Sequence, residues 1–144
     1  MSKIGFIGYG SMGSLIINEL LSSNALKQGE IIISNRTTNK LSDIKKEYPE
    51  IEITENNLNL ADKCHIIFLF VSTSAVKDVI KEMKPYLSKN SHIIYISAGL
   101  TIETVKSIFQ GKVTKIIPSL TSKVHEGVSL VCHSEEVVMM NQNS

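Results

Sequence analysis

The sequence predicts an α/β fold with a doubly wound, mainly parallel sheet and helices on both of its faces. Short apolar runs alternate with amphipathic stretches along most of the chain, which is typical of strand–helix–strand units. The run at 66–71 is continuously apolar and indicates a central strand covered on both faces. A glycine-rich turn joins the first apolar run to the first amphipathic stretch. Right-handed crossovers then distribute the helices over both faces.

The expected strands follow one another along the whole chain and are bounded by turn residues. We expect them at 3–7, 31–34, 51–53, 66–71, 93–97, 113–117 and 128–132. The strand at 113–117 stops at Pro118, which lacks the N–H that a sheet needs. We expect the strand at 128–132 to be the last one and to lie at the edge of the sheet.

Helical spacing of apolar residues predicts the helices between these strands. We expect them at 11–21, 38–48, 57–62, after the capping residues 72–74, and at 101–109. In the first helix the predicted buried face consists of Met12, Leu15, Ile16 and Leu20.

The length of 144 residues fits one domain of ordinary size. We expect residues 1–134 to form that domain. Residues 135–140 read as the start of a helix, so we expect 135–144 to begin a connection to a helical domain that this chain lacks. On this interpretation the chain is the N-terminal part of a longer protein.

Composition argues against several kinds of partner. Fifteen basic and 14 acidic residues leave a net charge of +1, which gives no general attraction to nucleic acid or to an anionic membrane. The longest apolar run is too short to span a bilayer. Cys64 and Cys132 are far apart and show no metal-ligand spacing. We therefore expect a cytoplasmic protein with reduced thiols, no bound metal, no membrane and no nucleic acid.

The turn after the first strand reads Gly8-Tyr9-Gly10-Ser11-Met12-Gly13 and fits the pattern G-x-G-x-x-G. The pattern is informative because it follows a predicted strand and opens a predicted helix. Gly8 permits the tight turn, Gly10 lets the backbone approach a pyrophosphate, and Gly13 lets the helix pack closely on the strand. The N–H groups of the first turn, which contains Ser11 and Met12, would bind the anion. These features predict a dinucleotide-binding domain of the Rossmann type.

The end of the second strand predicts which dinucleotide is bound. Folds that prefer NAD place an acidic residue there to hold the ribose 2′-hydroxyl. This chain instead has Asn35-Arg36-Thr37, with Lys40 one turn further on. Arg36 can make a planar, bidentate contact with a 2′-phosphate, and Lys40 can add positive charge. We therefore expect NADP(H) in preference to NAD(H).

Several of these segments together resemble one enzyme family, pyrroline-5-carboxylate reductase. The resemblance rests on the run from Ile4 to Gly13, on Ser34-Asn35-Arg36-Thr37, on Ser97-Ala98-Gly99-Leu100-Thr101, and on Ile117-Pro118 followed by Glu126-Gly127-Val128. Within the family, the segments 115–121 and 127–131 look most like the late competence protein ComER branch.

The resemblance implies the reduction of 1-pyrroline-5-carboxylate to L-proline by hydride transfer from NAD(P)H. It also implies a helical C-terminal domain that forms the homo-oligomer and contacts the imino-acid substrate, so this chain alone should be inactive. Carried over by motif, the cofactor-binding residues are Gly8, Gly10, Ser11, Met12, Gly13, Asn35, Arg36, Thr37, Lys40, Val71, Ser72, Ala98 and Gly99. No catalytic residue is assigned.

The chain departs from the family on the substrate side. The family's Val-Lys-Pro reads Val71-Ser72-Thr73 here, and its Met-Pro-Asn-Thr-Pro reads Ile117-Pro118-Ser119-Leu120-Thr121. Pro118 and Ser119 are therefore substrate-side candidates. The departures favour the alternative of a non-catalytic, regulatory reductase-like protein of the ComER type. A third alternative is a 6-phosphogluconate or β-hydroxyacid dehydrogenase, against which the run Ser34-Asn35-Arg36-Thr37 argues.

Overall fold

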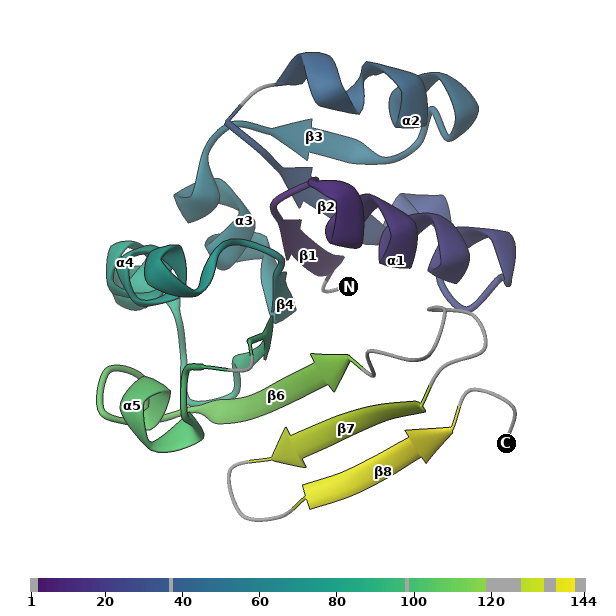
Figure 1. Ribbon diagram of the computed structural model, residues 1–144. Coiled ribbons are helices and arrows are strands. Elements are labelled where there is room, and N and C mark those ends of the chain that lie inside the picture. The colour runs from purple at the N-terminus through teal and green to yellow at the C-terminus, as the bar shows by residue number, and fades with distance from the viewer. Residues whose placement is uncertain (1–2, 37, 98, 119–127, 134–136, 142–144) are drawn as a thin grey trace.

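The computed structural model describes residues 3–36, 38–97, 99–118, 128–133 and 137–141, and in it one sheet runs through the whole fold (Figure 1). The strand order is β3-β2-β1-β4-β5-β6-β7-β8. Strands β1 to β6 pair in parallel, whereas β7 and β8 add to the edge in antiparallel pairing. This confirms the predicted fold class. The strands are β1 (Lys3–Ile7), β2 (Ile31–Ser34), β3 (Glu52–Thr54), β4 (Cys64–Leu69), β5 (His92–Ile96), β6 (Lys112–Pro118), β7 (Val128–His133) and β8 (Val137–Asn141).

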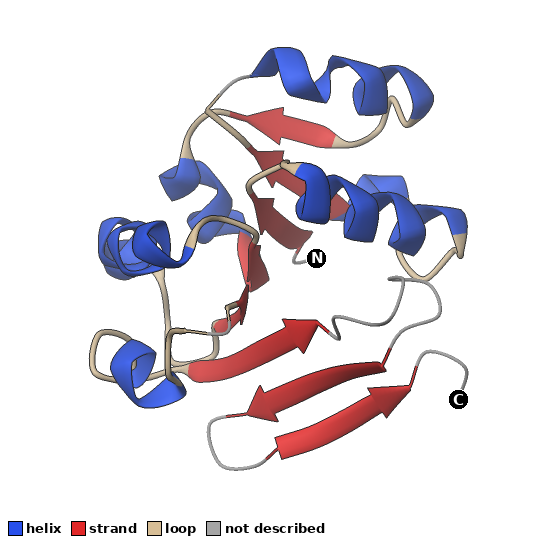
Figure 2. Ribbon diagram, in the orientation of Figure 1, coloured by secondary structure: helices blue, strands red, loops and turns tan. Residues whose placement is uncertain are grey.

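Helices cover both faces of the parallel part of the sheet (Figure 2). One apolar cluster joins α1 and α2 to one face of the sheet, and a second joins α3, α4 and α5 to the other. The α-helices are α1 (Ser11–Ser22), α2 (Ser42–Glu47), α3 (Asn57–Lys63), α4 (Thr73–Met83) and α5 (Ile102–Lys106). Short 3-10 turns η1 (Gln28–Glu30), η2 (Thr38–Leu41) and η3 (Lys84–Tyr86) connect them.

The order of the strands in the sheet creates a crevice at the carboxyl ends of the central strands. Strand β1 pairs with β2 on one side and with β4 on the other. The connections that leave the carboxyl ends of β1 and β4 therefore diverge to opposite sides. Open α/β sheets bind their ligands at such a switch point, outside the carboxyl ends of the strands.

The buried face of α1 differs from the predicted one. Ile17 and Leu21 are inside the core, whereas Leu15 is 53% exposed and Leu20 only packs against the core. The apolar residues of this helix form overlapping stripes, so spacing alone did not decide between them. Gly13 decides, because it packs against the strand ends and thereby turns the residues four and eight positions later inward.

Two other expectations about elements were wrong. The single helix at 38–48 is divided into η2 and α2. Residues 137–141 form strand β8 rather than the start of a helix, and β7 is therefore not the edge strand. Val137 and Val138 are β-branched residues that favour extended backbone, and the outer side of β7 offers unpaired backbone groups to a further strand. The domain boundary at residue 134 stays a prediction.

No helix in the described part of the chain combines the length and the apolar character needed to cross a membrane.

Candidate functional site

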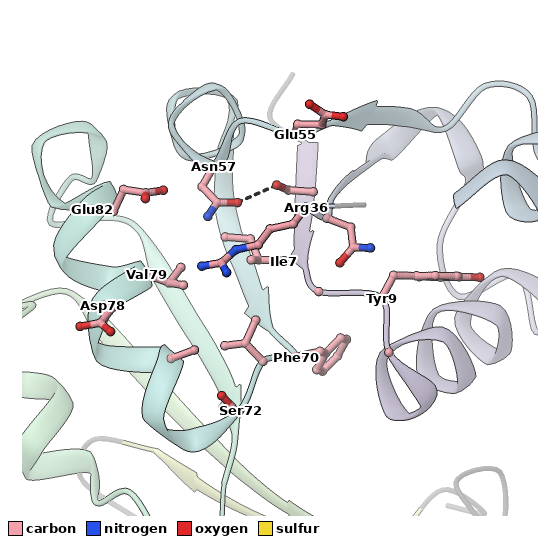
Figure 3. Close-up of a pocket in the computed structure, with 16 residues that line it drawn as sticks. Ile7, Tyr9, Arg36, Glu55, Asn57, Phe70, Ser72, Asp78, Val79 and Glu82 are labelled. Atoms are coloured by element: carbon pink, nitrogen blue, oxygen red, sulfur yellow. Dashed lines mark hydrogen bonds between the residues drawn. The ribbon is translucent and has the colours of Figure 1, made fainter. Parts of the chain in front are cut away.

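A cavity of about 560 Å³ opens at the switch point, beside the carboxyl ends of β1, β2 and β4. Its walls come from the glycine-rich turn, the end of β2, the turn between β3 and α3, and one side of α4 (Figure 3). The lining residues are Ile7, Gly8, Tyr9, Gly10, Ser34, Asn35, Arg36, Glu55, Asn57, Phe70, Val71, Ser72, Ala75, Asp78, Val79 and Glu82.

Gly8 holds the glycine-rich turn against the neighbouring strands. Its φ angle is +98°, in the left-handed region that side chains avoid, and its N–H donates to the Ser34 carbonyl oxygen at 2.8 Å. A Cβ atom at Gly8 would lie 2.3 Å from the carbonyl oxygen of Phe70. The chain therefore needs glycine here for the turn and for the close approach of β4.

The start of α1 leaves room for a ligand. Gly10 is the N-cap residue of α1, its carbonyl oxygen accepts from Ser14 N–H at 2.9 Å, and no side chain caps the helix. A Cβ at Gly10 would meet no atom within 4 Å, whereas one at Gly13 would lie 3.0 Å from the Gly8 carbonyl oxygen. The N-terminus of α1 thus faces the cavity side uncapped, with the partial positive charge that helix N-termini carry.

Arg36 is the only cation on the cavity wall as far as the chain is described. It is exposed and has no hydrogen bond or ion pair with another described residue, and in Figure 3 its side chain extends from the end of β2 toward α4. Beside it, the Ser34 hydroxyl donates to the Asn57 side-chain oxygen at 2.6 Å. The guanidinium group is therefore available to an anion without breaking a contact.

A hydroxyl network holds the loops at the ends of β4 and β5 together. The Ser97 hydroxyl oxygen, at the end of β5, accepts from the N–H groups of Gly99 at 3.1 Å and Leu100 at 3.0 Å. It also lies 3.0 Å from the Thr73 hydroxyl oxygen at the start of α4. Because two N–H donors occupy the lone pairs of Ser97, its own proton is donated to Thr73.

We expect Ser97→Ala to destabilise the fold by about 1–3 kcal/mol, because it leaves the buried Leu100 N–H without a partner. Urea unfolding of the chain measures this free energy. The control is Ser107→Ala, which removes an exposed hydroxyl and should cost less than about 0.5 kcal/mol. Equal effects of the two substitutions would show that the network does not stabilise the loops.

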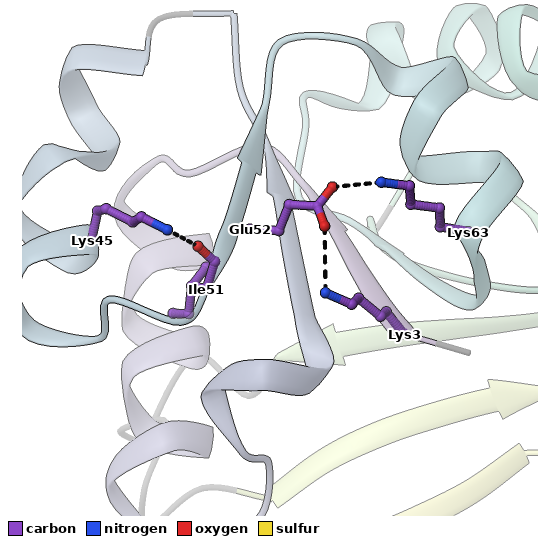
Figure 4. Close-up of polar contacts among 5 residues, drawn as sticks. All are labelled: Lys3, Lys45, Ile51, Glu52 and Lys63. Carbon is purple, nitrogen blue, oxygen red and sulfur yellow. Dashed lines mark hydrogen bonds and ion pairs between the residues drawn. The ribbon is translucent and has the colours of Figure 1, made fainter. Parts of the chain in front are cut away.

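At the amino ends of the strands, in contrast, the charged side chains are paired. Glu52 on β3 accepts from Lys63 at 2.9 Å and from Lys3 at 3.4 Å (Figure 4). Nearby, Lys45 donates to the carbonyl oxygen of Ile51 at 2.5 Å. The hydrogen bond from Lys63 is the main cause that lowers the pKa of Glu52 below its usual 4.5, against the opposing effect of burial, and Lys3 adds to it.

We expect the Glu52 contacts to make stability depend on pH in acid. Because the folded-state pKa is lowered, these contacts stabilise the fold above the usual pKa and stop doing so as the pH falls through the lowered value. Glu52→Gln should lower the free energy of unfolding by less than about 1 kcal/mol at pH 7, because both ion pairs are partly exposed. Once Glu52 is protonated, the substitution should not change the free energy of unfolding. Urea unfolding from pH 7 to pH 3 tests this, with Glu47→Gln as the control. A cost that stays constant in acid would refute the expectation.

The structure brings together six of the predicted cofactor-binding residues on the cavity wall: Gly8, Gly10, Asn35, Arg36, Val71 and Ser72. Gly13 packs behind the wall, and Gly99 is exposed outside it. Only the backbone is described at Ser11, Met12, Lys40 and Pro118. Thr37, Ala98 and Ser119 lie outside the described residues, so their roles stay predictions.

Sequence reasoning missed two parts of the wall. Glu55 and Asn57 follow β3, so they lie at the same edge of the sheet as the glycine-rich turn. The rule that ligands bind at the carboxyl ends of parallel strands could have found them. The other missed part is the side of α4 formed by Ala75, Asp78, Val79 and Glu82, whose helical spacing was available in the sequence.

The rings of Phe6, Phe68 and Phe70 form a cluster that connects the packed interior to the cavity wall, which Phe70 lines, whereas Cys64 is buried away from the cavity. Phe6 stacks on Phe68 with ring centroids 4.9 Å apart. Burial raises the pKa of the Cys64 thiol to about 12, so it stays protonated. Within the described residues, no group of three His, Cys, Asp or Glu side chains could hold a metal ion.

The fold and the cavity together define a Rossmann-type nucleotide-binding domain. Residues 3–99 match the family described as NADP oxidoreductase, coenzyme F420-dependent, and the chain belongs to this family.

Known relatives refine this assignment. The chain is 33% identical over 136 residues to pyrroline-5-carboxylate reductase 3 of Bacillus subtilis, covering 94% of this chain and 50% of the relative. It is 34% identical over 129 residues to ComE operon protein 4 of the same organism, and the match covers 90% of this chain and 47% of that relative. The crystal structure of Plasmodium falciparum pyrroline carboxylate reductase with NADP bound matches with a TM-score of 0.74 at 25% identity, covering 92% of this chain and 48% of that one.

These relatives confirm the predicted resemblance to pyrroline-5-carboxylate reductases, with the ComE operon protein among them. The chain spans about half the length of the curated relatives it matches.

Proposed function

We propose that this chain is the NADP(H)-binding domain of an oxidoreductase that reduces 1-pyrroline-5-carboxylate to L-proline. The observation that carries the proposal is the cavity, whose wall includes the N-terminus of α1, which no side chain caps, and Arg36, which has no partner among the described residues. The family match and the NADP-bound relative support the same cofactor.

The residues on the wall fit the groups of NADP(H). The first turn of α1 and Gly10 would bind the pyrophosphate, because N–H groups there lack helical partners and no Cβ intervenes. Arg36 would hold the 2′-phosphate, and Asn57, fixed by its bond from Ser34, would lie beside the adenosine ribose. Val71 and Ser72 would contact the dinucleotide where it crosses from one half of the sheet to the other.

When bound, NADPH supplies the hydride that reduces the C=N bond of the cyclic imine. This chain's part is to fix the dinucleotide in the crevice, because correct positioning supplies much of an enzyme's rate. The relatives are twice as long, and we propose that the remaining half of such a protein supplies most substrate contacts and the homo-oligomer interface. Pro118 and Ser119 are the substrate-side candidates within this chain.

Calorimetric titration of the chain with NADPH, and in parallel with NADH, tests the proposal. We expect NADPH to bind at least about tenfold more tightly, because one charge-assisted contact to the 2′-phosphate is worth that factor. We expect no formation of L-proline from pyrroline-5-carboxylate by this chain alone.

Two results would contradict the proposal. If a folded sample binds neither dinucleotide, the regulatory, non-catalytic alternative replaces it. Proline formation by this chain alone would refute the proposal that the substrate contacts come mainly from the other half of such a protein. We further propose that the protein acts in the cytoplasm without nucleic acid or membrane partners, in line with its net charge of +1.

A further inference from the structure

The charges of α4 are sorted between two sides of the helix. Asp78 and Glu82, one turn apart, line the cavity together with the apolar Ala75 and Val79. Lys77 and Lys81 each precede one of these acids in the sequence, are exposed, and do not line the cavity. In Figure 3 the Glu82 carboxylate points toward Asn57, on the cavity side of the helix. The helix therefore presents the Glu82 carboxylate to the cavity and its lysines elsewhere, and Asp78 is also among the lining residues.

This arrangement opposes phosphate binding at that part of the wall. On this part of the wall α4 contributes the acids Asp78 and Glu82, whereas the single guanidinium of the described wall, that of Arg36, extends from the end of β2. Carboxylates accept hydrogen bonds and repel anions, so the part of the ligand that meets them must carry N–H or O–H donors and no phosphate.

The position of Glu82 along α4 indicates which part of the dinucleotide meets these carboxylates. Ser72 lies at the glycine-rich end of the cavity, since Gly8 packs against the backbone of Phe70 and the side chain of Val71. Glu82 follows ten residues later, about 15 Å further along an ideal helix. The pyrophosphate belongs at the glycine-rich end, so the far end receives the adenosine, whose flat base suits the apolar side chains of Ala75 and Val79.

We propose that Glu82, assisted by Asp78 one turn earlier, recognises the adenine base by accepting a hydrogen bond from its exocyclic 6-amino group. This inference rests on the proposed dinucleotide binding and adds to it the choice of base. A base with a carbonyl oxygen at position 6 would turn a lone pair toward the carboxylate and would be rejected.

The test compares NADPH with reduced nicotinamide hypoxanthine dinucleotide phosphate, in which a carbonyl oxygen replaces the 6-amino group. Dissociation constants of both are measured by calorimetry on the unsubstituted chain. We expect the hypoxanthine analogue to bind about tenfold more weakly, as loss of one hydrogen bond to a charged group implies. Equal dissociation constants would overturn the inference while leaving the proposed function intact. No binding of NADPH by a folded sample would overturn both.

Glu82→Gln identifies the residue responsible. The glutamine amide can donate to the carbonyl oxygen as readily as it accepts from the amine, so the ratio of the two dissociation constants should fall to about one. Lys81→Gln is the matched control, since it changes one charge on the same helix away from the cavity, and its ratio should stay about ten. A ratio of about ten in Glu82→Gln would show that Glu82 does not read the base.

Discussion

Arg36→Ala should weaken the binding of NADPH by about 10- to 100-fold and the binding of NADH by less than about threefold. The guanidinium is exposed on the cavity wall and has no partner among the described residues, so its removal costs the fold little. Its loss removes a charge-assisted, bidentate contact that only a 2′-phosphate can make. Titration calorimetry with both dinucleotides measures the two changes.

The control for this prediction is Lys46→Ala, which removes one positive charge from α2 outside the cavity wall. It should leave the preference for NADPH unchanged, apart from a small effect that salt screens. If Arg36→Ala weakens both dinucleotides equally, the guanidinium does not bind the 2′-phosphate. The preference for NADP(H) would then have to come from other residues, such as Lys40.

The positions of the strands along the chain were predictable because each strand carries its own local signal. The six parallel strands lie within a few residues of their predicted positions, since apolar runs bounded by glycine, proline and polar residues depend on local chemistry. Which side of α1 is buried was not predictable from the spacing of its apolar residues. It depends on the close contact of Gly13 with the Gly8 carbonyl oxygen and with Phe70, and neither of these residues belongs to the helix. Strand β8 likewise depends on the edge that β7 provides.

The candidate site likewise has parts that the sequence predicted and parts that it did not. The glycine-rich turn and the end of β2 were found because each motif is contiguous and has one chemical purpose. The side of α4 with Asp78 and Glu82 was missed because charged residues of an amphipathic helix usually form its solvated face, and their spacing does not show which of them line a cavity. Their place on the cavity wall follows only from packing Val76 and Ile80 into the core, which turns the acids toward the crevice.

Substitution by alanine at two glycines of the turn should affect different properties, namely NADPH binding at Gly10 and the stability of the fold at Gly8. Gly10→Ala should weaken NADPH binding at least about tenfold, because its methyl group enters the space through which the backbone approaches the pyrophosphate. Its φ of −82° suits any residue and the new Cβ meets no atom within 4 Å, so only the loss of an N-cap glycine, about 1 kcal/mol, affects stability.

Gly8→Ala should instead destabilise the fold by about 3 kcal/mol or more. Alanine is strained at a φ of +98°, and its Cβ would lie 2.3 Å from the Phe70 carbonyl oxygen, so the turn or β4 must move. Urea unfolding and calorimetry on both variants separate the two effects. If Gly10→Ala binds NADPH as well as the unsubstituted chain does, the backbone at residue 10 does not contact the pyrophosphate. The dinucleotide would then have to enter the cavity from the side of α4 rather than across the start of α1.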